Sequence, residues 1–566
     1  MASPKPSAAA NTATEYLKIY KKKMKKRYVI GMDFGTLSVR CVIADALTGK
    51  TVAESVSEYE HGVMDDTFLD GSPLKSKIAL QHPLDYINSM KSTVTECLSA
   101  SSLNAEDIAG VGVDFTGSTV LPVDKDGIPL CFDGRFSNEP HAYVKLWKSH
   151  SAEAEANAVT ALAEKRGEPW LIGYGGKISS EWMIPKILET LNDAPHVYEA
   201  AAEFTEAGDL ITRLLTGSST RSTSFAGFKG IWNDETGYAS NAFFCELDSR
   251  MDGIVGTKIS QNVRPVGEIA GYVDERGASL SGLAVGTPVC LSILDAHAAM
   301  PALGISGERE LMLILGTSGC FIINDSAAKN IPGICGKVND AIFKGYYTYE
   351  AGQSCLGDGF DWFVKNFVPE KYTVAARESG VSIHKYLRDK AQKLAVGQSG
   401  LLVLDWFNGN RSILADYDLS GMILGLTLTT KPEEIYRAII EASAFSSRMI
   451  IDNFSDNGIE IGTIYASGGI ALKDEMMMQI LADVTRREIH VSSATQAGAL
   501  GSAIFASVVA GIFANIKDAV KVMSVPSARI YHPIPENSQA YDKLYAEYSL
   551  LHDYFGRGGN DVMKRI

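Results

Sequence analysis

Apolar and polar positions near the start of the chain follow a pattern that returns half a chain later. Residues 28–45 contain two apolar runs separated by a short turn, which begins with Gly35 and Thr36. The same plan recurs over 311–324. Two apolar runs around a small glycine turn predict an antiparallel pair of strands. The two copies lie about half a chain apart, which is far longer than the repeat period of a solenoid. The pattern therefore predicts two similar halves.

Strands and helices alternate along the rest of the chain. Apolar runs predict buried strands over 109–115, 120–123, 289–294, 463–466 and 489–491. Helical spacing of apolar residues predicts helices over 140–165, 181–192, 208–216, 434–451, 472–484, 497–516 and 535–556. This alternation indicates the α/β class.

The repeat also divides the chain into domains. We expect a boundary near residue 304, with an N-terminal domain over 28–304 and a C-terminal domain over 305–566. A leader over 1–27 precedes them; it is rich in Ala, Ser and Pro and ends in a run of Lys and Arg. We expect this leader to be a basic, disordered tail, and the alternatives are a targeting segment for an organelle and a contact with an acidic surface.

Composition and charge exclude several classes of protein. Apolar residues make up 46% and charged residues 21% of the 566 positions, which is ordinary for a globular enzyme. The net charge of −14 argues against a general nucleic-acid surface. Residues 497–516 carry no charge and are long enough to cross a bilayer. Because they are rich in Ala, Gly and Ser, we expect a buried helix and no contact with a membrane.

The eight cysteines are scattered, without a CxxC pair or the spacing of a zinc site. Several lie in apolar runs, which predicts buried free thiols. We therefore expect a protein of a reducing compartment, the cytoplasm, unless the leader directs it elsewhere.

The two glycine turns are candidate phosphate sites, because small Gly, Thr and Ser turns expose backbone N–H groups and hydroxyls. The second turn consists of Gly316, Thr317 and Ser318. One such turn in each half predicts a nucleotide held between the halves. Asp33, beside the first turn, would repel phosphate unless Mg²⁺ lies between them. The alternative for Asp33 is a carboxylate that caps the turn.

Two further segments indicate where a reaction would take place. Asp295 ends the apolar run over 289–294, where a kinase needs a carboxylate to accept a hydroxyl proton. A helix-capping Asp is the alternative. Gly468 and Gly469 form a turn between a strand and a helix, where the backbone can approach a flat purine closely. A plain strand-to-helix turn is the alternative there.

Sugar binding calls for aromatic side chains and for polar groups in apolar surroundings. Trp147, Lys229 and Glu350 fit this description, because they lie in apolar or glycine-containing runs. For Lys229 and Glu350 the alternative is an ordinary surface charge.

Taken together, these motifs resemble those of the FGGY carbohydrate kinases. The match rests on the order of Asp33-Phe34-Gly35-Thr36, Asp295, Gly316-Thr317-Ser318 and Gly468-Gly469. A further run, at 421–426 and 434–441, resembles the C-terminal signature of the family. The resemblance covers residues 28–566. Within the family the chain is most similar to the L-ribulokinases, over 114–119, 145–150, 174–182, 333–336, 349–354 and 404–411.

The resemblance implies a fold of two actin-like (ribonuclease-H-like) domains around an interdomain catalytic cleft. It makes Asp295 the general base, and Asp33 then belongs to a Mg²⁺ site. The implied sugar ligands are Thr116, Gly117, Ser118, Lys229, Asp295 and Glu350. The implied ATP ligands are Gly35, Thr36, Gly316, Thr317, Ser318, Gly468 and Gly469.

The implied reaction transfers a phosphoryl group from ATP, with Mg²⁺, to the terminal hydroxyl of a ketopentose. L-ribulose is the expected substrate, converted to L-ribulose 5-phosphate in arabinose catabolism. The alternatives are another specificity within the family (D-ribulose, xylulose or a pentitol) and, more remotely, a non-catalytic actin-like sugar sensor. A homodimer is expected from the resemblance alone. Asp474 stands where many relatives have an amide or a small polar residue, which bears on the adenine pocket.

Overall fold

The computed structural model describes residues 27–566. The basic leader predicted over 1–27 therefore lies outside the described residues, except for Arg27. Within the described part of the chain, no helix is long and apolar enough to cross a membrane.

The first half is built on a seven-stranded sheet. Its strands follow the order β13-β14-β5-β1-β2-β3, and β15 also pairs with β5. Their bounds are β1 (Tyr28–Phe34), β2 (Ser38–Asp45), β3 (Lys50–Glu58), β5 (Ile108–Phe115), β13 (Ile269–Tyr272), β14 (Pro288–Cys290) and β15 (Ile293–Leu294). Strand β1 pairs antiparallel with β2 and parallel with β5. The hairpin predicted over 28–45 is therefore present, and its turn follows β1.

The second half contains another seven-stranded sheet, in the order β18-β19-β17-β16-β22-β23-β24. The bounds are β16 (Glu310–Leu315), β17 (Gly319–Asp325), β18 (Gly336–Asn339), β19 (Tyr347–Gln353), β22 (Thr463–Ser467), β23 (Ile489–Ser492) and β24 (Ser527–Tyr531). Strand β16 pairs antiparallel with β17 and parallel with β22. The hairpin predicted over 311–324 is thus present as well.

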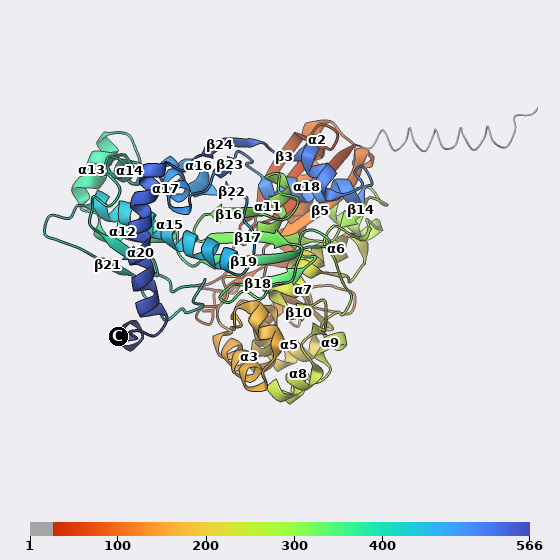
Figure 1. The fold of residues 1–566 in the computed structure, drawn as a ribbon. Coiled ribbons are helices and arrows are strands. Elements are labelled where there is room, and N and C mark those ends of the chain that lie inside the picture. Colours follow the sequence, from red (N-terminus) through yellow and green to blue (C-terminus); the bar gives the residue numbers. More distant parts are fainter. Residues whose placement is uncertain (1–26) are drawn as a thin grey trace, which may run out of the picture.

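The two sheets share one plan. In each, the first strand of the hairpin lies next to a parallel strand, β5 in the first sheet and β22 in the second. Beyond these, an antiparallel strand ends the sheet, β13 in the first and β24 in the second. Figure 1 shows the two sheets in separate halves of the molecule. The predicted α/β fold of two similar domains is confirmed.

Helix α18 (Ala497–Val509) returns from the second half of the chain to the first sheet. Its backbone lies directly on β1 and β5, because Gly31 and Gly112 have no side chain. A Cβ at either position would overlap the carbonyl oxygen of Ala499 or Ser502. Figure 1 shows this blue helix beside the orange strands. The predicted helix is buried as expected, although it is shorter than the predicted range 497–516.

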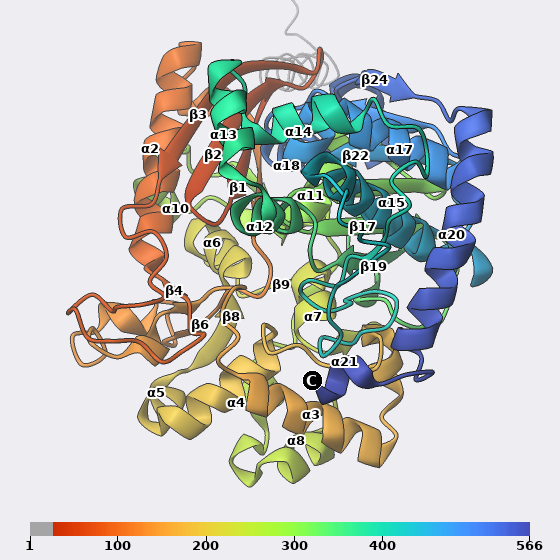
Figure 2. The same ribbon diagram turned by 90° about the vertical axis from the view of Figure 1, so that its left-hand side faces the viewer.

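A separate lobe is inserted in the first half and has its own apolar core. A small sheet with the order β4-β7-β6-β8 forms one part of it. The elements are β4 (Leu80–Gln81), β6 (Val120–Val123), β7 (Val144–Lys145), β8 (Glu203–Glu206), α3 (Glu153–Arg166), α4 (Met183–Asp193), α5 (Pro195–Ala200) and α8 (Asn241–Leu247). Figure 2 shows the helices of this lobe at the bottom of the molecule.

The remaining elements cover the sheets, connect them or complete the lobe. The helices are α2 (Pro83–Ser101), α6 (Ala207–Thr216), α7 (Thr223–Lys229), α9 (Ile254–Thr257), α10 (Glu275–Ser281), α11 (Asp295–Ala302), α12 (Gly357–Phe367), α13 (Glu370–Glu378), α14 (Ile383–Ala391), α15 (Pro432–Asp456), α16 (Gly469–Lys473), α17 (Glu475–Thr485), α19 (Ile516–Met523), α20 (Pro535–Gly556) and α21 (Val562–Arg565). The short strands are β9 (Arg221–Ser222), β10 (Trp232–Asn233), β11 (Gly237–Tyr238), β12 (Val263–Arg264), β20 (Leu402–Leu404) and β21 (Met422–Leu424).

Three other predicted elements differ from the structure. The helix predicted over 140–165 begins only at Glu153, because β7 occupies its first part and lies between β4 and β6. The helix predicted over 472–484 is interrupted at Asp474, whose Oδ1 accepts a 3.0 Å hydrogen bond from the N–H of Met477 and caps α17. The single strand predicted before Asp295 is divided into β14 and β15.

Candidate active site

Three carboxylates lie where neighbouring strands of the first sheet end. Asp33 on β1 and Asp114 on β5 are partners in the parallel register. Asp295 directly follows β15, which pairs with the end of β5. Because the carboxyl ends of parallel strands meet at one edge of a sheet, the fold brings these side chains to the same place.

A cavity of about 210 Å³ lies at this edge. Eight residues predicted for the site line it, namely Thr36, Thr116, Gly117, Ser118, Trp147, Lys229, Asp295 and Glu350. The other lining residues are Glu181, Leu294, Ala296, His297 and Arg411. All the residues predicted to bind sugar are thus brought together around one space, together with Thr36 of the first glycine turn.

Asp295 borders the cavity with a partly exposed side chain. Its Oδ1 accepts a 2.7 Å hydrogen bond from the backbone N–H of Ala296. Burial, followed by the negative charge of Asp33, raises the pKa of Asp295 to about 7. A carboxylate with a pKa near neutrality can accept a proton from a hydroxyl group and release it afterwards.

Glu350 reaches the cavity from β19, so the cavity is formed by both halves of the molecule. Its Oε2 lies 3.2 Å from Nε2 of His297, and its Oε1 accepts a 3.4 Å hydrogen bond from Arg411. Burial acts to raise the pKa of Glu350, but the charge of Lys229 and the hydrogen bond from His297 outweigh it. The pKa is therefore held well below its usual range. Glu350 is a charged, oriented acceptor for the hydroxyl groups of a ligand.

The orientation of His297 follows from a chain of hydrogen bonds. The backbone N–H of Leu294 donates to Oγ of Ser224 at 3.3 Å, and this Oγ lies 3.4 Å from Nδ1 of His297. Burial lowers the pKa of His297, so the ring is neutral at physiological pH. With one proton on the ring, Ser224 donates to Nδ1 and the Nε2–H donates to Glu350.

The wall of the cavity continues to the first glycine turn. The indole Nε1 of Trp147 donates a 3.1 Å hydrogen bond to Oγ1 of Thr36. Gly117 allows the loop after β5 to pack closely, because a Cβ there would lie 2.6 Å from Cδ2 of Leu294 and 3.1 Å from Cε of Lys229. A side chain at position 117 would therefore displace two groups that line the cavity.

The ATP ligands predicted in the second half lie outside this cavity. The turn over 316–318 joins β16 to β17, and Thr317 and Ser318 are exposed. Gly468 has a φ of 96°, and a Cβ there would lie 2.5 Å from the carbonyl oxygen of Leu315. The double-glycine turn therefore lies against the end of β16, next to the two exposed hydroxyl groups. Such a surface can offer N–H and O–H donors to phosphate.

The carboxylates at the edge of the first sheet fit a Mg²⁺ ion that is shared with phosphate. Oδ2 of Asp33 accepts a 3.2 Å hydrogen bond from Arg40, and buried Oδ1 of Asp114 has no hydrogen-bond partner in the part of the chain that the structure describes. Gly498 leaves space here, since a Cβ would lie 3.1 Å from Oδ2 of Asp33. Residues 27–566 contain no group of three or more His, Cys, Asp or Glu that could hold a metal by itself. Mg²⁺ often uses one or two carboxylates with water and phosphate oxygens, so this donor set suits it.

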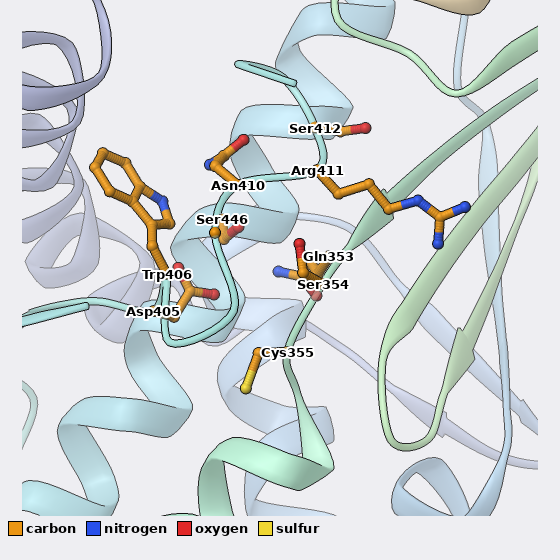
Figure 3. A pocket seen from close by; sticks show the side chains of 10 residues that line it. Gln353, Ser354, Cys355, Asp405, Trp406, Asn410, Arg411, Ser412 and Ser446 are labelled. Atoms are coloured by element: carbon orange, nitrogen blue, oxygen red, sulfur yellow. The ribbon is translucent and has the colours of Figure 1, made fainter. Parts of the chain in front are cut away.

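Sequence reasoning assigned no role to three residues of the cavity, Glu181, His297 and Arg411. Arg411 lies in an irregular loop without periodicity, and Figure 3 shows its side chain extending away from Asn410 and Ser412. No spacing signal pointed to it. His297 lies two residues after Asp295 at the start of a helix, and that proximity is a signal that could have found it.

Known proteins of one family share this architecture. Residues 28–302 match the N-terminal domain, and residues 311–510 the C-terminal domain, of the FGGY family of carbohydrate kinases. The chain is 47% identical over 535 residues to the ribulokinase of Bacillus licheniformis, which covers 94% of this chain and 97% of the relative. It is also 47% identical over 549 residues to the ribulokinase of Halalkalibacterium halodurans, with 96% and 97% covered.

The solved structure of the xylulose kinase from Rhodospirillum rubrum is similar to this chain in its fold. The TM-score is 0.76 at 22% sequence identity, over 93% of this chain and 98% of that chain. Both domain matches lie in the expected order, and they include Asp33, Asp295 and Glu350. The chain therefore belongs to the FGGY family of carbohydrate kinases, enzymes that use ATP with Mg²⁺.

Proposed function

We propose that this protein phosphorylates the terminal hydroxyl of L-ribulose with ATP, giving L-ribulose 5-phosphate for arabinose catabolism. The observation that carries the proposal is the charge pattern of the cavity. Asp295, with a pKa of about 7, shares it with the charged acceptor Glu350 and the buried cation of Lys229. The volume of about 210 Å³ suits a small polar ligand better than a nucleotide. The names of the two ribulokinase relatives support ribulose as that ligand.

In the proposed mechanism, Asp295 accepts the proton of the sugar hydroxyl as the hydroxyl oxygen attacks the γ-phosphorus of ATP. Lys229 donates to a sugar oxygen, and Glu350 accepts from sugar hydroxyls, so the reacting carbon is held beside Asp295. Thr116, Ser118 and the backbone at Gly117 complete the sugar-binding wall.

On the ATP side, the donors of the two glycine turns would contact the phosphate oxygens. Asp33, with Asp114 beside it, would hold Mg²⁺, which when bound neutralises charge on the transferred phosphoryl group. Narrowing of the cavity between the halves would exclude water, which is the competing acceptor of the phosphoryl group.

The experiment that tests this mechanism is the substitution Asp295→Asn, assayed by sugar-dependent ADP release. We expect turnover to fall by about 10³-fold, since a general base contributes roughly 10²–10⁴-fold. ATP affinity, measured by calorimetry, should change little. Asp405→Asn is the control, because burial likewise raises the pKa of Asp405 to about 7 but this residue lies outside the cavity. Near-normal turnover of Asp295→Asn would contradict the assignment.

A panel of sugars tests the specificity. L-ribulose should give the highest kcat/KM among L-ribulose, D-ribulose, D-xylulose and the pentitols, each assayed at several concentrations with saturating MgATP. A preference for xylulose or for a pentitol would replace the proposed substrate with another specificity of the same family. Absence of sugar-dependent ADP release with every sugar would favour a non-catalytic sugar sensor.

Two properties of the whole protein are part of the proposal. We infer a cytoplasmic enzyme, supported by eight cysteines that are all free thiols in the structure. We also infer a homodimer, which sedimentation velocity at micromolar concentration would test. A single species with the mass of one chain would contradict it.

A further inference from the structure

One buried ammonium group in the inserted lobe makes an unusual set of contacts. Lys186 on α4 is only 1% exposed. Its Nζ donates hydrogen bonds to three backbone carbonyl oxygens, those of Ser118 at 2.6 Å, Leu146 at 2.8 Å and Lys145 at 3.1 Å. A lysine ammonium has three N–H donors, so every one of them is used.

The three carbonyl groups belong to two different segments of the sugar-binding wall. Ser118 lines the cavity in the loop between β5 and β6. Lys145 and Leu146 directly precede Trp147, which lines the cavity and donates to Thr36. Lys186 thus fastens the loop to the segment that presents the indole, although it does not line the cavity itself.

The loop has a backbone conformation that needs such support. Ser118 has a φ of 58°, in the left-handed region that a residue with a side chain seldom adopts. Its neighbour Thr119 is held from the other side, because the backbone N–H of Thr119 donates a 2.8 Å hydrogen bond to Glu206. Two buried side chains, Lys186 and Glu206, therefore hold successive residues of the loop in place.

The charges around Lys186 offset only part of the cost of burying its ammonium group. Burial lowers the pKa of Lys186 to about 7; the negative charges of Glu206, Glu181 and Glu189 oppose this shift, and the positive charge of Lys145 adds to it. Glu206 lies at the end of β8 and Glu189 lies one helical turn further along α4, so the compensating charges come from two elements.

We propose that Lys186 is a positioning residue of the sugar site, which fixes the Ser118 loop and the Trp147 segment relative to each other and so sets the affinity for the sugar. The inference rests on the proposed function in one respect, namely that the cavity binds the sugar. The position of the two segments is a property of the ligand-free protein and can be measured without a substrate.

The same lobe offers a control, a partly buried lysine that is also bonded to backbone carbonyl groups. Lys258 donates to the backbone carbonyls of Tyr198 at 2.8 Å and Ala201 at 2.7 Å, and neither of these residues lines the cavity. Substitutions Lys186→Met and Lys258→Met each remove a lysine ammonium that is bonded to backbone carbonyls. Only the first should act on the sugar site.

The experiment compares the two variants with the full-length wild type. For Lys186→Met we expect amide hydrogen exchange to be faster over 116–119 and 144–147 without ligand, and the KM for the sugar to rise by at least about tenfold, because misplacement by about 1 Å can cost 10²-fold. The KM for ATP should stay within about twofold. Lys258→Met should alter exchange only near its own partners and leave the KM for the sugar unchanged.

The possible outcomes separate the two proposals. Unchanged exchange over 116–119 and 144–147 in Lys186→Met would overturn the positioning role, whatever the substrate is. Faster exchange there without activity on any sugar would leave the positioning role intact and contradict the proposed function. An equal rise of the KM for the sugar and of the KM for ATP would also overturn the positioning role. If Lys186→Met does not fold, Lys186→Gln, which keeps two donors, serves in the same measurements.

Discussion

At the scale of single residues, burial acts on two neighbouring carboxylates with different results. The pKa of Asp295 rises to about 7, because burial and the negative charge of Asp33 act in the same direction. In Glu350 the charge of Lys229 outweighs burial, and the pKa stays low. One carboxylate is thereby prepared to take up a proton and the other to remain charged, which is the division of roles that acid–base catalysis requires.

This difference predicts the pH dependence of the enzyme. Asp295 must be deprotonated to act as a base, and because its pKa is raised, more of it is protonated as the pH falls. We expect kcat/KM for the sugar to level off above about pH 7 and to fall about tenfold for each pH unit below it. Initial rates of ADP release between pH 5.5 and about 9 measure this, with circular dichroism to check folding. A flat profile across neutral pH would contradict the role of Asp295.

Some residues of the site could be predicted from the sequence, and others could not. Asp295, Lys229 and Glu350 stand out because each is a charge in an apolar or glycine-containing run, which has few ordinary explanations. Glu181 and Arg411 lie in loops whose meeting depends on packing between distant segments. Local sequence patterns carry no information about that packing.

At the scale of elements, close backbone contact explains how the first sheet and α18 fit together. Two strands have glycine where the helix passes over them, Gly31 on β1 and Gly112 on β5. The start of the same helix brings Gly498 beside Asp33. The packing of α18 therefore determines both its distance from the first sheet and the space around Asp33.

The substitution Gly112→Ala tests this contact. A Cβ at position 112 would overlap the backbone of Ser502, which cannot move aside as a flexible side chain can. We expect a loss of stability of about 1–3 kcal/mol, the usual cost of overpacking. The measurement is the shift of the thermal midpoint, with Gly134→Ala as the control because nothing lies within 4 Å of a Cβ there. Equal midpoints for the two variants would contradict the close packing.

Elements with strong periodicity could be predicted best. The two hairpins and α20 (Pro535–Gly556) agree closely with the predicted ranges, because their apolar spacing is long and regular. The start of the helix predicted over 140–165 was wrong, because β7 is only two residues long and its strand form comes from pairing with β4 and β6. A strand so short leaves no period to detect.

At the scale of the whole molecule, the two halves are joined by more than the chain between them. Glu350 of the second sheet contacts His297 of the first half, and α18, which follows β23 of the second sheet in the chain, packs on the first sheet. The repeat could be predicted from the two glycine turns. The return of α18 could not, because an apolar helix does not reveal which of two sheets it covers.

The returning helix predicts how the halves behave when separated. A fragment of residues 28–304 lacks α18, so apolar residues on one face of β1 and β5 would be exposed to water. We expect this fragment to aggregate when expressed alone and to become soluble when expressed together with residues 305–566. Gel filtration and circular dichroism measure both states. A soluble fragment with cooperative thermal unfolding would contradict the prediction.

The same helix also imposes an order of events during synthesis on the ribosome. Strands β1 and β5 are complete once residue 115 has emerged, but the helix that covers them ends only at Val509. At a translation rate of roughly 5–20 residues per second, one face of the earliest sheet waits tens of seconds for its cover. For that interval the nascent chain presents an apolar surface, so molecular chaperones that bind such surfaces have most of the translation time in which to engage it.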